Sequence, residues 1–175
     1  MPQALNQALL NDNKKIVTAE SCTGGAIVSG IISEAGSSAI IESAYVVYSN
    51  AMKTATLGVS KDTLSEFGAV SEQTVRAMAA GALEKSGADI AVATSGIAGP
   101  DGGTSEKPIG TVWIAWGSKD KIMARCFFLP IGRQGFQRTT SAIAMDLVRR
   151  ELLGCLLYTS PSPRDLSTSR MPSSA

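Results

Sequence analysis

Apolar residues recur along the first 154 residues with the two periods typical of amphipathic helices and buried strands. Helical spacing, capping serines and glycine stops predict helices over residues 3–12, 23–33, 50–57, 61–67, 72–86 and 136–153. Runs of β-branched and aromatic residues predict strands over 16–19, 40–48, 90–94, 111–116 and 122–129, with a hairpin turn at 117–120. Because strands and helices alternate first and a strand pair follows, we expect an α/β domain with a mixed sheet covered by helices.

The pattern stops after Gly154. Residues 155–175 read CLLYTSPSPRDLSTSRMPSSA, in which serine and proline dominate and neither period survives. We therefore expect one domain over residues 1–154 and a disordered tail over residues 155–175. The abrupt change in composition favours a cloning scar or a frame-shifted end over a natural flexible tail.

Charge and hydropathy exclude several classes of partner. The chain has a net charge of +1 and no long run of one sign, so we expect no strong binding to nucleic acid or to an anionic membrane. No segment approaches the roughly 20 apolar residues of a membrane span, and the N-terminal residues lack the pattern of a signal peptide. The three cysteines show neither a pairing pattern nor a zinc-binding spacing, which favours a reducing, cytoplasmic setting.

Residues 18–25, TAESCTGG, carry the strongest chemical signal in this chain. They lie between a predicted strand and a predicted helix, where backbone N–H groups at a helix N-terminus can stabilise an anion. Ser21 is a candidate nucleophile in this turn, and the alternative is a serine that merely caps the helix. The candidate oxyanion donors are the N–H groups of Cys22, Thr23, Gly24 and Gly25.

The chain contains no histidine, so a Ser-His-Asp triad is impossible. The base must be a lysine, a tyrosine, a carboxylate or a bound water. Cys22 is a rival nucleophile, because a thiol at a helix N-terminus has a lowered pKa. The alternative interpretation of Cys22 is a small buried hydrophobic residue.

A second cluster follows the predicted strand over residues 40–48. Tyr48 is expected at the end of that strand, Asn50 just after it, and Lys53 one turn into the next helix. A desolvated lysine can be neutral and can take the proton of a serine, whereas a tyrosine can relay that proton or hold the oxyanion. The alternative is an edge tyrosine and a solvated lysine.

A glycine-rich loop over residues 95–110 forms a third cluster. Its glycines allow backbone N–H groups to converge on an anion such as a phosphate, although the loop matches neither a P-loop nor a dinucleotide fingerprint. Arg133 and Arg138, near the start of the last predicted helix, are further candidates for phosphate, or else part of a solvated face. The candidate binding residues in the loop are Ser95, Gly96, Gly99, Gly102, Gly103 and Thr104.

These clusters together resemble one family. The motifs TAESCTGG at 18–25, YSN at 48–50 followed by Lys53, GAVSE at 68–72, SGIAGPDGG at 95–103 and KPIGTVW at 107–113 occur in the order found in the C-terminal domain of the CinA competence/damage-inducible family. Stand-alone copies of that domain are the PncC-type nicotinamide-nucleotide amidohydrolases. The resemblance covers residues 3–153 and implies a three-layer α/β/α domain with a largely parallel mixed sheet.

The resemblance also implies an activity, namely deamidation of nicotinamide mononucleotide to nicotinate mononucleotide and ammonia. It implies Ser21 as nucleophile, Lys53 as base and Tyr48 as an assisting group, without metal or cofactor, in a homo-oligomer, often a dimer. The loop over residues 95–104, with Arg138, would then hold the ribose and the 5′-phosphate.

One stretch departs from the family pattern, which usually has Gly-Asp-Arg before the last helix. Here residues 132–134 read Gly-Arg-Gln, so an acidic residue is missing and the first arginine is shifted to position 133. This departure favours an alternative function, a nucleotide-binding or regulatory module without turnover. A hydrolase of another amide or ester is a third possibility.

Overall fold

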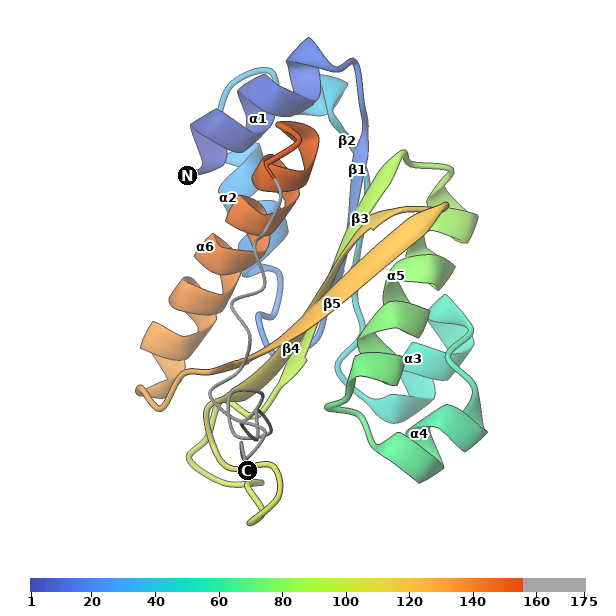
Figure 1. Ribbon diagram of the computed structural model, residues 1–175, viewed down its shortest axis with the longest axis vertical. Helices are drawn as coiled ribbons and strands as arrows, with labels where there is room; N and C mark the ends of the chain where they lie inside the picture. The colour runs from blue at the N-terminus through green and yellow to red at the C-terminus, as the bar shows by residue number, and fades with distance from the viewer. Residues whose placement is uncertain (156–175) are drawn as a thin grey trace, which may run out of the picture.

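The computed structural model describes residues 1–155, so the tail predicted from position 155 lies, apart from Cys155, outside the described residues. Within that range a five-stranded sheet is flanked by helices on both faces (Figure 1). The strands are β1 (Ile16–Glu20), β2 (Ile41–Val46), β3 (Ile90–Gly96), β4 (Thr111–Ser118) and β5 (Lys121–Phe128). The α-helices are α1 (Pro2–Asn11), α2 (Ala26–Ile32), α3 (Asn50–Leu57), α4 (Lys61–Phe67), α5 (Glu72–Ser86) and α6 (Arg133–Leu152).

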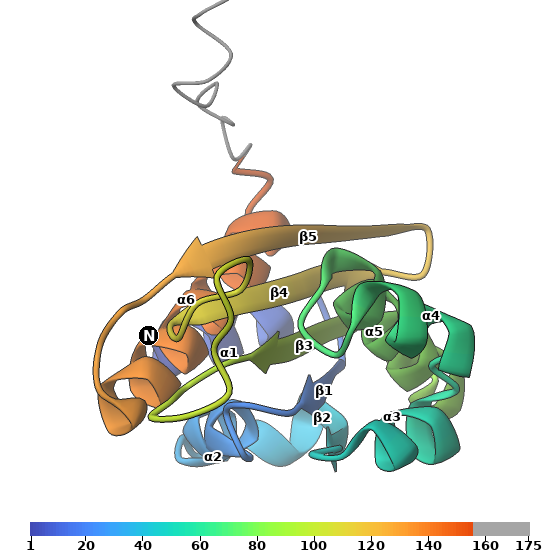
Figure 2. The ribbon, with the colours of Figure 1, turned by 90° about the horizontal axis from the view of Figure 1, so that it is seen from below.

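The strand order is β2-β1-β3-β4-β5. Strand β1 is parallel to both β2 and β3, whereas β3 with β4 and β4 with β5 are antiparallel pairs. Figure 2 shows the strands in this order between the two helical layers. The mixed α/β sheet that the sequence predicts is therefore confirmed, with the predicted strand pair as its antiparallel side.

The helices form two layers around two cores. Helices α1, α2 and α6 cover one face of the sheet, and α3, α4 and α5 cover the other (Figure 1). Side chains of β1 alternate between the cores, because successive strand residues point to opposite faces: Ile16 packs with α1, α2 and α6, while Val17 and Ala19 pack with α3 and α5. This is the three-layer arrangement that the resemblance implies.

Most predicted helix ends are correct because their caps are local. Ser60 and Ser71 each accept the backbone N–H three residues ahead, and Gly87 ends α5 with φ 69°. The prediction of a helix from residue 23 is wrong, since α2 begins at Ala26 and Gly25 is its N-cap with φ 96°. The residues before Ala26 form a turn, so the interpretation of Ser21 as the helix cap is wrong as well.

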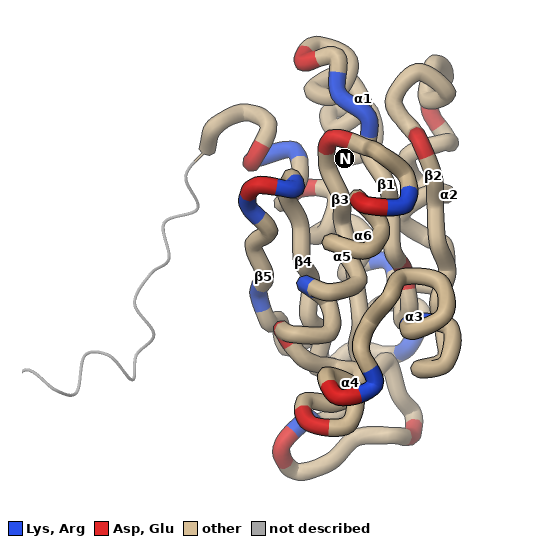
Figure 3. Tube along the Cα trace, turned by 90° about the vertical axis from the view of Figure 1, so that its right-hand side faces the viewer, with Lys and Arg blue, Asp and Glu red and all other residues tan. Residues whose placement is uncertain are grey.

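Charged residues of both signs are interspersed along the described chain (Figure 3). Among residues 1–155, no helix has the length and apolar character required to cross a membrane. The carboxyl ends of the parallel strands β1, β2 and β3 lie at one edge of the sheet, where the loop over residues 97–110 also lies (Figure 2). In open α/β sheets this edge is where ligands bind.

Candidate active site

Ser21 and Lys53 meet at the carboxyl edge of the sheet. Ser21 follows β1 directly and is 7% exposed, and its N–H donates to the carbonyl oxygen of Thr94 on β3 at 3.1 Å. Lys53 lies in α3, whose cap Ser49 fixes the start of the helix by accepting the N–H of Met52. The Lys53 Nζ lies 3.1 Å from Ser21 Oγ, so the two predicted residues, 32 positions apart, are in hydrogen-bond contact.

The amine of Lys53 has three polar neighbours and almost no solvent. Its Nζ donates to the carbonyl oxygens of Val47 and Tyr48, each at 3.1 Å, in addition to its contact with Ser21. The side chain is 1% exposed, and no carboxylate of the described residues forms an ion pair with it. Burial therefore lowers the pKa of Lys53 from its ordinary value of 10.5, which favours the neutral amine required of a base.

Glu20 is a residue that the sequence argument missed. Its side chain is completely buried, and its carboxylate accepts from Thr23 Oγ1 at 2.7 Å and from the N–H groups of Gly25, Ile27 and Val28 at 2.9–3.1 Å. It thus occupies the N-terminal end of α2. The signal available in the sequence was an acidic residue one position before the candidate nucleophile, at the end of an apolar strand.

The turn around Ser21 uses some of its N–H groups internally. The N–H of Gly24 donates to the Ser21 carbonyl oxygen at 3.2 Å, and that of Gly25 donates to Glu20. Within residues 1–155, the N–H groups of Cys22 and Thr23 donate to no other residue. Of the four predicted oxyanion donors, these two are available to a substrate.

Cys22 does not have the environment of a nucleophile. Its side chain is 5% exposed and belongs to the apolar core on the α2 side of the sheet. Burial raises the pKa of the thiol to about 12, against the lowering expected of a helix N-terminus. The interpretation of Cys22 as a small buried hydrophobic residue is the correct one for its side chain.

Tyr48 contributes its backbone to the Ser21–Lys53 pair and directs its phenol elsewhere. The ring is 64% exposed, and its hydroxyl accepts from Arg133 at 3.2 Å. Strand β2 ends at Val46, so Tyr48 lies two residues beyond the strand rather than at its predicted end. Arg133 also donates to the carbonyl oxygen of Gly99 at 2.9 Å, so one guanidinium joins the segment after β2, the glycine-rich loop and the start of α6. Asn50, the first residue of α3, is exposed and lies two residues after Tyr48 in the chain.

The predicted residues of the glycine-rich loop mostly maintain the loop itself. Ser95 is buried and its hydroxyl donates to the carbonyl oxygen of Ala69 at 2.7 Å. Thr104 closes a turn with Lys107 through both its N–H and its hydroxyl. A Cβ at Gly96 would lie 2.8 Å from the Thr111 carbonyl oxygen, so close packing requires glycine there.

The remaining loop glycines are also required by the conformation of the loop. A Cβ at Gly103 would lie 2.8 Å from the Ile109 N–H, and Gly99 and Gly102 have φ of 73° and 90°. Arg138 is exposed on α6, one residue after Gln137, whose side-chain amide donates to the Cys22 carbonyl oxygen at 3.1 Å. Gln137, which the sequence argument also missed, fastens the turn around Ser21 to α6.

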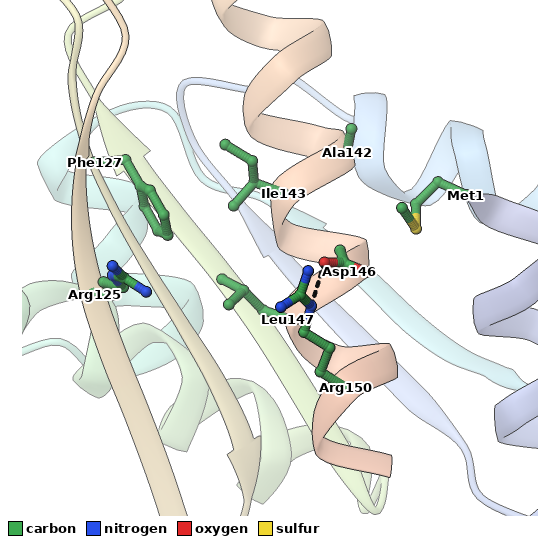
Figure 4. A pocket seen from close by; sticks show the side chains of 8 residues that line it. All are labelled: Met1, Arg125, Phe127, Ala142, Ile143, Asp146, Leu147 and Arg150. Carbon is green, nitrogen blue, oxygen red and sulfur yellow. Dashed lines mark hydrogen bonds and ion pairs between the residues drawn. The ribbon is translucent and has the colours of Figure 1, made fainter. Parts of the chain in front are cut away.

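Two other features of the described residues bear on the site. No group of three or more Cys, Asp or Glu side chains in residues 1–155 could hold a metal ion. A groove of about 360 Å³ lies between β5 and α6, and it contains none of the predicted site residues (Figure 4). The groove is lined by Met1, Arg125, Phe127, Ala142, Ile143, Asp146, Leu147 and Arg150.

Known proteins are similar to this chain in sequence and in fold. A CinA-like protein of Colwellia psychrerythraea is 53% identical over 153 residues, which cover 85% of this chain and 35% of that protein. The nicotinamide-nucleotide amidohydrolase PncC of Pseudomonas putida is 46% identical over 142 residues, which cover 81% of this chain and 89% of that protein. A crystal structure of a CinA superfamily protein from Klebsiella pneumoniae has a TM-score of 0.85 at 33% identity, covering 87% of this chain and 96% of the other.

The chain spans about a third of the length of its CinA-like relatives and most of the length of the PncC relative. The profile of the CinA C-terminal domain matches residues 1–152, which is nearly every described residue. The chain therefore belongs to the CinA C-terminal domain family.

Proposed function

We propose that this protein is an amidohydrolase that converts nicotinamide mononucleotide and water to nicotinate mononucleotide and ammonia. The observation that carries the proposal is the buried Ser21–Lys53 pair, with 3.1 Å between its reacting atoms and a lysine pKa lowered by burial. The PncC relative, 46% identical and covered over 89% of its length, supports this choice of substrate.

The hydrogen bonds of Lys53 give its neutral amine a direction. A neutral amine has two N–H donors and one lone pair, and the carbonyl oxygens of Val47 and Tyr48 take the two donors. The lone pair then faces Ser21 Oγ, whose proton it can accept as the oxygen attacks the carboxamide carbon. We therefore assign the base to Lys53, with Tyr48 acting through its backbone oxygen.

The N–H groups of Cys22 and Thr23 are proposed to stabilise the oxyanion of the tetrahedral intermediate. The protonated Lys53 then gives its proton to the leaving nitrogen, the C–N bond breaks, and ammonia departs from an acyl-serine ester. A water molecule attacks that ester, Lys53 takes the water's proton and returns it to Ser21, and nicotinate mononucleotide is released.

The exposed residues around the pair are proposed to hold the rest of the substrate. Arg133, Arg138 and the loop over residues 97–110 offer donors to the ribose and the 5′-phosphate, and Asn50 lies at the same edge of the sheet. Remote contacts of this kind fix the carboxamide against the nucleophile and so raise the rate of the chemical step. A homodimer in the cytoplasm is our proposal for the assembly and its setting.

A nucleotide-binding module without turnover is the second candidate. It is favoured by the Gly-Arg-Gln stretch at 132–134, where Arg133 is engaged with Tyr48 and Gly99. It is also compatible with a domain that matches only a third of its longer relatives.

Ammonia release separates the two candidates. The wild-type protein and Ser21→Ala are incubated with nicotinamide mononucleotide, and with nicotinamide riboside as the comparison that lacks the phosphate. We expect release by the wild type from the mononucleotide in preference to the riboside, and none by the variant. Binding of the mononucleotide without release by the folded wild type would favour the module, and equal release from both substrates would favour a different amide or ester.

A further inference from the structure

The mechanism above leaves one buried carboxylate without a role. Glu20 is 0% exposed, directly precedes Ser21, and forms no ion pair with any described lysine or arginine. A buried carboxylate without a cation is costly unless hydrogen bonds satisfy its oxygens. Its four donors supply that satisfaction, and all of them belong to the turn and the helix that follow Ser21.

Glu20 and Ser21 face opposite layers of the molecule. Successive strand residues alternate, so Glu20 extends toward α2 while Ser21 extends toward Lys53 on α3. Between them, the Ser21 N–H is fixed to the Thr94 carbonyl oxygen. The Thr94 hydroxyl also lies 2.9 Å from that of Thr23, which itself donates to Glu20. Thr94 of β3 therefore contacts the turn twice, at Ser21 itself and two residues later at Thr23.

We propose that Glu20 is a positioning residue, whose carboxylate binds the turn after Ser21 and so sets the oxygen of Ser21 and the free N–H groups of Cys22 and Thr23 in reactive geometry. It also takes the N–H groups of Gly25 and Ile27. Because the Gly24 N–H donates to the Ser21 carbonyl oxygen, the oxyanion is left with the two donors nearest the nucleophile. The reaction it serves is that of the proposed function. The positioning of Ser21 is independent of which substrate is cleaved.

The chemistry of the carboxylate makes Glu20→Gln an informative change. An ionised carboxylate has two acceptor oxygens, whereas a glutamine amide has one oxygen and an NH₂ group that only donates. In Glu20→Gln, that NH₂ would face either the Val28 N–H or the three donors on the other oxygen, which come from Thr23, Gly25 and Ile27. Glutamine has nearly the volume of glutamate, so the change disturbs the hydrogen bonds of the turn without leaving a cavity.

The test compares Glu20→Gln with Glu42→Gln, a matched change at an exposed carboxylate of β2 that pairs with Lys15. The first readout is kcat and KM for ammonia release from nicotinamide mononucleotide. The second is the rate at which an alkyl fluorophosphonate labels Ser21, followed by intact-protein mass spectrometry and peptide mapping. Labelling forms a phosphorus–oxygen bond at Ser21 Oγ and expels fluoride, so it reports the reactivity of Ser21 without any nucleotide.

In Glu20→Gln we expect kcat and the labelling rate each to fall by about 100-fold, with KM changed less than about threefold. Glu42→Gln is expected to match the wild type in all three. A folded Glu20→Gln protein with wild-type kcat and labelling, whose only defect is a lower Tm, would overturn the proposal. A raised KM with unchanged kcat would overturn it as well, because it would assign Glu20 to substrate binding.

A gentler variant keeps the proposal testable where Glu20→Gln does not fold. Thr23→Val removes one of the four donors, and Thr23→Ser retains that hydroxyl. We expect labelling of Ser21 to be several-fold slower in the valine variant and less affected in the serine variant. Equal labelling in both would refute the positioning role. If the wild type releases no ammonia but its Ser21 is labelled faster than that of Glu20→Gln, the proposed substrate is refuted and the positioning role stands.

Discussion

Replacing Lys53 by methionine tests the centre of the proposed mechanism. Methionine has nearly the length and the apolar stem of lysine, so Lys53→Met keeps most of the packing of a side chain that is 1% exposed. It removes the amine that lies 3.1 Å from Ser21 Oγ, and with it the only side-chain hydrogen bond of that oxygen among the described residues.

The expected loss in rate follows from the role of the amine. A positioned general base contributes about 10²- to 10⁴-fold to a rate, equivalent to about 3–5 kcal/mol of transition-state stabilisation. The change also leaves the carbonyl oxygens of Val47 and Tyr48 without their donor, at about 1–3 kcal/mol each. Removal of a buried amine offsets part of that cost, so the variant is expected to fold with a lower Tm.

The assay measures kcat for ammonia release and the rate of Ser21 labelling by a fluorophosphonate. Lys85→Met, a change of the same kind at an exposed lysine of α5, is the control and is expected to match the wild type. If the folded Lys53→Met protein retains more than about a tenth of the wild-type kcat, the assignment of Lys53 as base is wrong.

The lowered pKa of Lys53 adds a test by pH. Because burial lowers this pKa in the folded protein, the unfolded chain binds more protons between the folded pKa and 10.5, and the free energy of unfolding rises with pH over that interval. One proton gives a slope of at most about 1.4 kcal/mol per pH unit. Urea unfolding at several pH values should show this slope in the wild type and its loss in Lys53→Met, and Ser21 labelling should rise with pH only in the wild type.

Three further predictions concern the nucleophile, its neighbour and the packing of the fold. Ser21→Ala should release no ammonia and bind nicotinamide mononucleotide within about threefold of the wild type by calorimetry, since it deletes a bond-forming atom; retained turnover would contradict this. Cys22→Ala should keep kcat within about threefold and lower the free energy of unfolding by about 1 kcal/mol, because a buried sulfur is lost; an inactive, folded variant would make the thiol the nucleophile. Gly81→Ala should lower the free energy of unfolding by about 3 kcal/mol or more, because its Cβ would clash with the Leu57 carbonyl oxygen. In Gly132→Ala, where a Cβ meets nothing within 4 Å, thermal denaturation should show little change, and equal Tm values for the two alanine variants would contradict the packing argument.

The element order could be predicted from the sequence because its signals are local. Serine caps at positions 60 and 71 and a glycine stop at position 87 bracket helices whose ends agree with the structure. The start of α2 could not be predicted from the sequence, because the side chain that caps it belongs to Glu20 of β1 and not to a serine or threonine beside the helix. Hydrophobic periodicity could not predict the strand order either, since parallel pairing joins segments as far apart in the sequence as β1 and β3.

In the candidate site too, residues in local motifs could be predicted, whereas contacts between distant segments could not. Ser21 and Lys53 are marked by motif, and the structure adds their contact across 32 positions. Gln137 is 115 positions from the Cys22 carbonyl oxygen that it binds, and no local pattern indicates such a pair. Several loop glycines were expected to bind an anion, yet Gly96 and Gly103 are also required by the close approach of neighbouring backbone.

The order of Glu20 and Ser21 in the chain determines which face of the sheet each side chain reaches. A strand alternates its side chains between two faces, so two adjacent residues can contact the helical layers on opposite sides of the sheet. Here one residue binds the helix on one side and the next contacts the lysine on the other. A shift of one residue at the end of β1 would exchange these faces and set a carboxylate against the amine of Lys53. An ion pair there would raise the pKa of the lysine and remove the neutral base on which the proposed reaction depends.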